Sequence, residues 1–147
     1  MQFQTNKDKV LIIDFGSQVT KLIARRVREI GVYCEIITPK KLIKFKDYND
    51  IKGFIFSGGP STVTATKFET VPKDIFKKKI PILGICYGLQ LIAKLLGGKI
   101  KASKKRREFG RAFLQKKKTS LLTNKYLNNR KAVWMSHEDA VVKLPKN

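Results

Sequence analysis

Three short apolar runs recur along the first two thirds of the chain, and each ends in a polar or glycine-containing segment. Residues 10–13 (VLII), 53–56 (GFIF) and 81–85 (PILGI) contain no polar side chain. Uninterrupted apolar runs of this length are typical of strands buried on both faces of a parallel sheet. Residues 33–37 are predicted to form a further strand.

Segments between these runs have the spacing of helices. Apolar side chains within residues 18–30 recur every three or four positions, and residues 87–96 are predicted to form another helix. Strands that alternate with helices predict an α/β fold with a mostly parallel central sheet flanked by helices. Shorter strands are predicted near residues 110–115 and 131–135, with a polar turn near residues 124–130 between them.

The composition is that of a globular protein. The chain has 147 residues, 42% apolar and 29% charged, which fits one domain over residues 1–147. No apolar run approaches the ~20 residues that span a bilayer, and the N-terminus lacks the pattern of a signal peptide. Two cysteines, Cys34 and Cys86, form no disulfide framework, so we expect free thiols and a cytoplasmic location.

The net charge of +21 is the unusual feature of the composition. Such a charge is compatible with nucleic-acid binding, since basic residues displace the counterions of phosphates. The lysines are spread between apolar segments, however, and no recognisable nucleic-acid motif accompanies them. We therefore favour a lysine-rich solvated surface over a nucleic-acid interface, and a phosphate-bearing partner surface stays open.

Cys86 follows the third apolar run and lies between two glycines. Gly84 precedes it by two residues and Gly88 follows it by two, as expected for a tight strand-to-helix turn that presents a nucleophile. A helix N-terminus favours the reactive thiolate, and the N–H of Tyr87 would point toward a developing oxyanion. The segment Gly58-Gly59 offers a second backbone donor. A buried structural thiol is the alternative, and it is the favoured interpretation for Cys34.

Five segments together resemble a known family. They are Ile13–Gln18 (IDFGSQ), Ser57–Ser61 (SGGPS), Gly84–Gln90 (GICYGLQ), Arg107–Arg111 (REFGR) and Val133–His137 (VWMSH). In this order they resemble the class I glutamine amidotransferases, which implies a flavodoxin-like fold. The last two segments, and a tyrosine after the cysteine, are similar to the glutaminase domain of the GMP synthase branch.

The resemblance implies a specific chemistry. Cys86 would attack the side-chain amide of glutamine to form a glutamyl thioester and ammonia. The backbone N–H groups of Gly59 and Tyr87 would hold the oxyanion. Glutamine contacts are expected from polar residues, namely Gln90, Ser61 and, in a loop, Ser136, His137 and Asp139. A capping role is equally compatible with Ser61.

The resemblance also implies partners and cofactors. Glutamine hydrolysis itself needs no cofactor and no metal. The ammonia would pass to a separate ATP-pyrophosphatase or synthetase domain or subunit, where ATP and Mg²⁺ are expected and XMP becomes GMP. No membrane partner is implied.

Two departures from the family pattern matter for activity. His137 is the only histidine, and we rank it first as a glutamine contact, second as a structural loop residue and third as the base for Cys86. The family's catalytic histidine lies in a later His-Pro-Glu motif, so we expect a domain incomplete at its C-terminus: a fragment, a truncated product or a split subunit. Glu138 stands where the family usually has glycine.

Three other functions stay open at this point. The chain could be a different class I glutamine amidotransferase subunit. It could be an inactive glutamine-binding module without the histidine and glutamate of the triad, or a basic protein that binds nucleic acid.

Overall fold

The computed structural model describes residues 8–102, 108–115, 120, 131–137 and 139–146. The chain divides into two compact units, residues 1–101 with 141–147 and residues 102–140.

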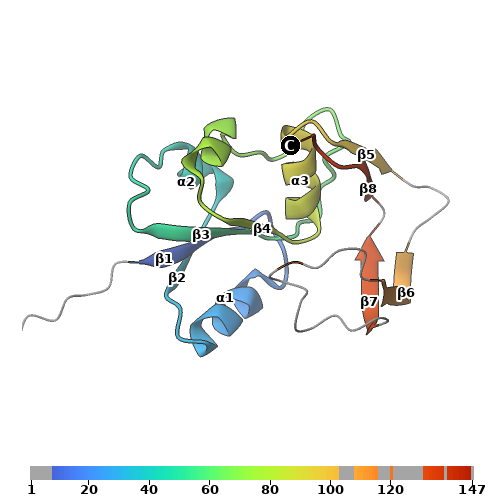
Figure 1. Ribbon diagram of the computed structural model, residues 1–147, viewed down its shortest axis with the longest axis horizontal. Helices are drawn as coiled ribbons and strands as arrows, with labels where there is room; N and C mark the ends of the chain where they lie inside the picture. Colours follow the sequence, from blue (N-terminus) through green and yellow to red (C-terminus); the bar gives the residue numbers. More distant parts are fainter. Residues whose placement is uncertain (1–7, 103–107, 116–119, 121–130, 138, 147) are drawn as a thin grey trace, which may run out of the picture. The chain divides into compact units, whose positions relative to one another are not determined.

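A four-stranded parallel sheet forms the centre of the first unit (Figure 1). Its strands are β1 (Lys9–Ile13), β2 (Cys34–Ile37), β3 (Ile51–Phe56) and β4 (Ile82–Gly84), in the order β2-β1-β3-β4. The register aligns Ile13 with Phe56, and Phe56 with Gly84. The carboxyl ends of β1, β3 and β4 therefore meet at one edge of the sheet, and the four predicted strands are confirmed.

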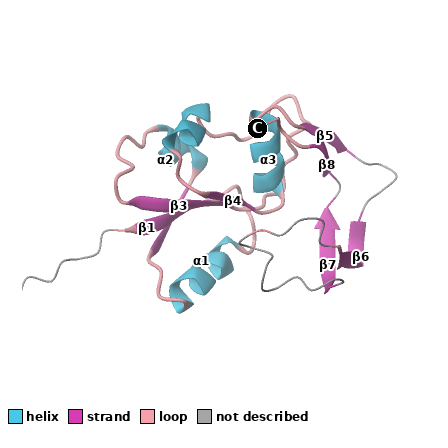
Figure 2. Ribbon diagram, in the orientation of Figure 1, coloured by secondary structure: helices cyan, strands magenta, loops and turns pink. Residues whose placement is uncertain are grey.

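Helices cover both faces of this sheet (Figure 2). Helix α1 (Thr20–Glu29) lies on one face, where Ala24 packs with Ile12 and Cys34. Helices α2 (Pro39–Ile43) and α3 (Tyr87–Leu95) lie on the other face. The predicted α/β fold is thus confirmed, as is the packing of Cys34 in the core.

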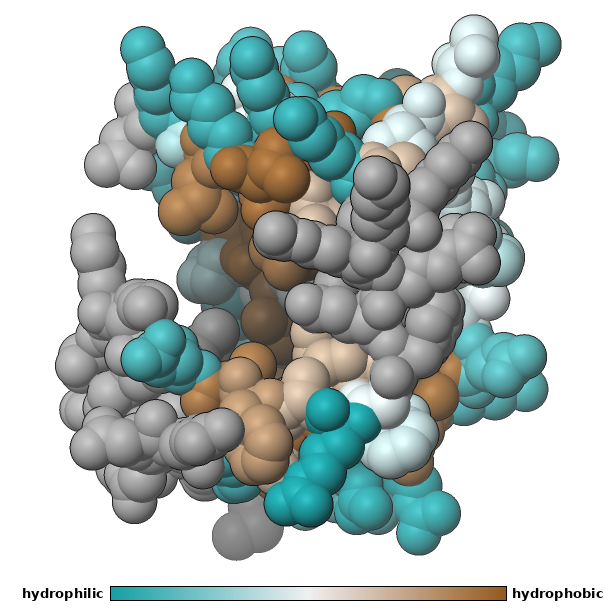
Figure 3. All heavy atoms as spheres, turned by 90° about the vertical axis from the view of Figure 1, so that its right-hand side faces the viewer, coloured by the Kyte–Doolittle hydropathy of each residue, from teal (hydrophilic) through white to brown (hydrophobic). Residues whose placement is uncertain are grey.

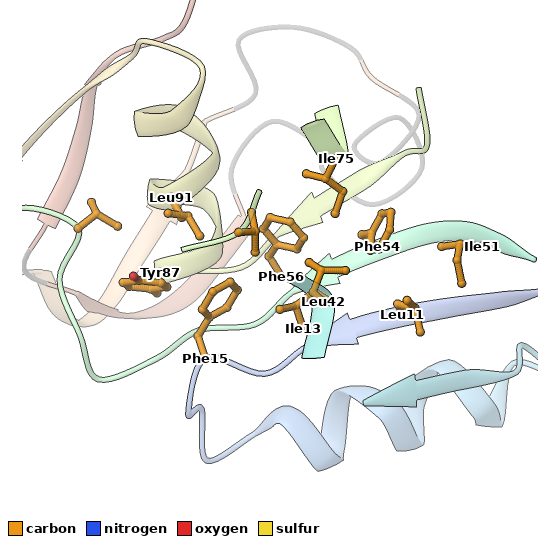
Figure 4. Close-up of a cluster of buried hydrophobic side chains, with 12 residues drawn as sticks. Leu11, Ile13, Phe15, Leu42, Ile51, Phe54, Phe56, Ile75, Tyr87 and Leu91 are labelled. Carbon is orange, nitrogen blue, oxygen red and sulfur yellow. The ribbon is translucent and has the colours of Figure 1, made fainter. Parts of the chain in front are cut away.

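The larger apolar core lies between the sheet and the helices α2 and α3 (Figure 4). Leu11, Ile13, Phe54 and Phe56 point into it because alternate residues of a strand face the same side. Their partners are Leu42 of α2, Ile75, Leu91 of α3, Phe15 and Tyr87. The core extends to the carboxyl edge of the sheet and supports the segments that follow β1 and β3.

Several elements were not predicted from the sequence. Thr38 caps α2 by accepting a hydrogen bond from Lys41 N at 3.3 Å, and Pro39 occupies the first helical position. A 3₁₀ helix, η1, covers Lys73–Lys78. Strands β5 (Lys99–Ala102) and β8 (Asp139–Lys143) form a separate two-stranded sheet.

The second unit contains an antiparallel strand pair. Strand β6 (Glu108–Leu114) pairs with β7 (Lys131–His137), and Arg111 lies opposite Trp134. The two weaker strand predictions are therefore confirmed. The turn predicted near residues 124–130 lies outside the described residues.

Lysine side chains lie on the surface, as the basic composition predicts. Lys40 and Lys41 of α2 and Lys99 and Lys101 of β5 are exposed, and hydrophilic side chains lie along the top and the lower right of the face in Figure 3. Within the part of the chain that the structure describes, no helix is both long and apolar enough to cross a membrane.

Candidate active site

Cys86 lies between β4 and α3 and forms the N-cap of that helix. Its backbone has φ 51° and ψ −112°, a conformation that is unfavourable for any residue with a Cβ. Among the described residues, Lys79 is the only other non-glycine residue with positive φ. The Cys86 side chain is exposed, so a sharp turn presents the sulfur at the surface.

Two glycines permit this turn because a side chain at either position would collide with the backbone. A Cβ at Gly84 would lie 2.7 Å from the backbone nitrogen of Leu89, and one at Gly88 would lie 2.4 Å from the carbonyl oxygen of Phe56. The N–H of Gly88 also donates to the carbonyl of Ser57 at 3.1 Å. Helix α3 is thus packed directly on the carboxyl end of β3.

The segment Gly58-Gly59 lies beside Cys86. A Cβ placed on Gly58 would be 3.5 Å from the Cβ of Cys86, and one placed on Gly59 would be 2.3 Å from the carbonyl oxygen of Phe15. A side chain is therefore excluded at Gly59, whereas Gly58 would meet only ordinary contacts. The backbone of this segment approaches both the cysteine and the segment after β1. The two glycines predicted to supply a backbone donor are close to the predicted nucleophile.

Asp14 stabilises the neighbouring loop after β1. Its Oδ1 accepts hydrogen bonds from the backbone N–H of Gly16 at 3.0 Å and from Thr20 Oγ1 at 2.8 Å. Asp14 thus shapes the loop by bonding a nearby backbone amide and a nearby hydroxyl.

Tyr87 follows the cysteine and is almost completely buried, with 1% of its surface exposed. Its hydroxyl donates to the carbonyl of Glu69, and its ring lies 5.1 Å from that of Phe15 between centroids. Burial raises the pKa of Tyr87 to about 12, and the charge of Glu69 adds to the effect. The side chain therefore anchors the start of α3 as a neutral phenol.

The other predicted site residues differ in their placement. Gln90 is buried on α3, and its backbone N–H donates to the carbonyl of Cys86 at 3.1 Å. Ser61 is exposed in the loop after β3. The first unit thus brings Gly59, Tyr87 and Gln90 together around Cys86.

The remaining predicted glutamine contacts belong to the second unit. Ser136 and His137 are the last residues of β7, and Asp139 is the first of β8. The expectation of a loop at these positions is wrong, because strand pairing continues through His137, which lies opposite Glu108. The side chains of Ser136 and His137, and all of Glu138, lie outside the described part of the chain.

One cavity of the described residues lies at the opposite edge of the sheet from Cys86. A cavity of about 610 Å³ is lined by residues including Tyr48, Ile51 and Lys78. Because Ile51 begins β3, this cavity lies at the amino edge of the sheet, away from Cys86. The part of the chain that the structure describes contains no group of three or more His, Cys, Asp or Glu side chains placed to hold a metal ion.

The comparisons with known proteins agree with this geometry. Residues 11–147 match the family "Glutamine amidotransferase class-I". The chain therefore belongs to the class I glutamine amidotransferases.

Two curated proteins with similar sequences are GMP synthases. The chain is 50% identical over 141 residues to the glutamine-hydrolyzing GMP synthase of Agrobacterium fabrum and 46% identical over 144 residues to that of Treponema denticola. These matches cover 95% and 98% of this chain but only 27% of either relative. The chain thus spans about a quarter of the length of the curated relatives it matches.

Solved structures show the same fold. A protein from Thermoplasma acidophilum that bears the name of a GMP synthase subunit superposes with a TM-score of 0.73 at 25% identity. A glutamine amidotransferase from Thermotoga maritima superposes with a TM-score of 0.69 at 27% identity. The matches cover 94% and 95% of this chain, and 68% and 64% of those proteins.

Proposed function

We propose that this chain is the glutaminase part of a GMP synthase, with Cys86 as its nucleophile. The observation that carries the proposal is the backbone of Cys86, held at φ 51° with its side chain exposed at the carboxyl edge of a parallel sheet. A strained, accessible cysteine at this edge is costly for stability and suited to catalysis. Membership of the family and the similarity to GMP synthases support the assignment.

The proposed reaction proceeds through a covalent intermediate. The Cys86 thiolate adds to the side-chain carbonyl carbon of glutamine, and the oxyanion accepts hydrogen bonds from the N–H groups of Gly59 and Tyr87. The carbon–nitrogen bond then breaks as the nitrogen takes up a proton and leaves as ammonia. Water hydrolyses the resulting glutamyl thioester to glutamate and restores the thiolate.

The roles of the other polar residues follow from the family resemblance. Gln90 and Ser61 would contact the glutamine from the first unit. By the same resemblance, Ser136, His137 and Asp139 would be glutamine contacts. In the larger enzyme the ammonia would be consumed by an ATP-dependent synthetase partner that converts XMP to GMP.

A glutamine-directed electrophile tests this proposal. 6-Diazo-5-oxo-L-norleucine should label Cys86, and free glutamine should slow the labelling. Cys34 is an internal control because its thiol is buried, and Cys86→Ser should abolish the modification. Peptide mapping by mass spectrometry gives the site. An unlabelled Cys86, or labelling that glutamine does not slow, would contradict the proposal and favour an inactive module.

A second measurement tests the partner. Joined to the later segment of a GMP synthase that carries its His-Pro-Glu motif, the chain should support GMP formation from XMP, ATP and glutamine when a GMP synthetase domain is added. The same mixture with free ammonia in place of glutamine is the control for the synthetase. If ammonia sustains GMP formation and glutamine does not, the coupling part of the proposal is wrong.

A further inference from the structure

Ser57 occupies the junction of three elements at the candidate site. It directly follows β3 and has none of its surface exposed. Its backbone N–H donates to the carbonyl of Ile13 at 3.0 Å, and its carbonyl accepts from the N–H of Gly88 at 3.1 Å. The backbone of Ser57 alone therefore fixes this residue relative to β1, β3 and α3.

The hydroxyl of Ser57 makes two buried hydrogen bonds. Oγ accepts from the backbone N–H of Phe15 at 3.0 Å and donates to the carbonyl of Gly58 at 2.7 Å. One acceptor and one donor interaction suit a single hydroxyl whose hydrogen points toward Gly58. The side chain thereby joins the segment after β1 to the carbonyl group of Gly58.

That carbonyl belongs to the same peptide group as the N–H of Gly59. The described residues include no cis peptide bond, and in a planar trans peptide the C=O and N–H bonds point in opposite directions. Fixing the oxygen of Gly58 therefore fixes the direction of the Gly59 N–H. Two consecutive glycines put little restriction of their own on this peptide, so the orientation depends on external contacts.

From this arrangement we infer that Ser57 is a positioning residue, which orients the Gly59 N–H as an oxyanion donor for the reaction at Cys86. The inference rests on the proposed function. Phe15 supports the same arrangement, because its N–H holds Ser57 while its carbonyl oxygen lies against Gly59. Ser57 would touch no substrate itself and would act only through the peptide that it holds.

Two reactions of the same thiol separate this role from a general structural one. Acylation of Cys86 by the γ-p-nitrophenyl ester of glutamate forms an oxyanion, and its p-nitrophenolate leaves as a stable anion without taking up a proton from a protein acid. Alkylation by iodoacetamide is a direct displacement at carbon that forms no oxyanion. The variants are Ser57→Ala, which removes the donor, and Ser57→Thr, which keeps it. Thr20→Val is the matched control, since it deletes another buried hydroxyl nearby.

Ser57→Ala should slow acylation by about 10-fold to 100-fold, less than the loss of a whole oxyanion donor. Its alkylation rate should stay unchanged, Ser57→Thr should restore acylation, and Thr20→Val should affect neither rate. If the alanine variant does not fold, Ser57→Cys replaces it, because a thiol fills the same site but donates weakly.

Unchanged acylation in the folded alanine or cysteine variant would overturn the inference while leaving the proposed function intact. A parallel loss of both rates would also overturn it, because Cys86 itself would then be displaced. Failure of the unmodified chain to be acylated would instead refute the proposed function.

Discussion

Replacement of Cys86 by glycine should give a more stable folded chain than replacement by alanine. Alanine keeps the Cβ that makes φ 51° and ψ −112° unfavourable, a conformation that costs about 1–3 kcal/mol. Glycine removes that cost but loses more conformational entropy on folding, about 0.5–1 kcal/mol. The balance favours glycine by about 1 kcal/mol. Cys86 is exposed, so both variants lose little buried surface.

Urea denaturation measures this difference directly. The glycine variant should unfold at a higher urea concentration than the alanine variant, with the same dependence on denaturant. Leu89 supplies the control pair, because it is half-exposed within the same helix. At position 89 the order should reverse, and alanine should be more stable than glycine by about 1 kcal/mol. If the alanine variant is more stable than the glycine variant at both positions, the idea that the backbone at Cys86 is strained is refuted.

Three further predictions concern packing and titration. Gly88→Ala should destabilise the fold by about 1–3 kcal/mol or more, because its Cβ would lie 2.4 Å from a backbone oxygen; Gly53→Ala, whose Cβ would meet only contacts of 3.7 Å or longer, should be nearly neutral in thermal unfolding. The raised pKa of Tyr87, about 12, means that the folded state keeps a proton that the unfolded chain loses above about pH 10. Stability should therefore fall by about 2–3 kcal/mol as the pH rises through this range, and urea titrations of Tyr87→Phe should lack that part of the fall. The hydrogen bond from Lys9 lowers the pKa of Glu35. The contribution of this pair to folding stability is therefore fully present above the ordinary glutamate pKa of 4.5, and it is lost as the pH falls through the lowered pKa. Because Glu35 is partly exposed, Glu35→Gln should remove less than about 1 kcal/mol of this acid-sensitive stability, and an equal acid response in both proteins would contradict the assignment.

The position of the candidate nucleophile could be predicted from local sequence. A continuous apolar run predicts a buried strand, and the glycines on either side of Cys86 predict a turn too tight for side chains. The contacts at Gly84 and Gly88 show the physical cause, since both positions face backbone atoms. The conformation of Cys86 itself could not be predicted from these signals, because a cysteine has no preference for positive φ.

The tertiary contacts around the candidate site could not be predicted from the sequence. Ser57 stands next to two glycines and resembles an ordinary loop residue, although its hydroxyl links Phe15 to Gly58. These partners are brought together by the sheet register and not by local sequence. The pairing of β5 with β8 is similar, because it joins strands far apart in the chain. In contrast, Thr38 and Pro39 carry a usable helix-start signal for α2 that was missed in the sequence.

The buried thiol of Cys34 can report local opening of the fold. Its sulfur is inaccessible between α1 and the sheet and donates to the carbonyl of Ala24. A disulfide reagent can reach this atom only after the helix lifts from the strands. Exposed Cys86 would react first, and the slower modification of Cys34 would measure the rate of that local opening under native conditions, without any introduced label.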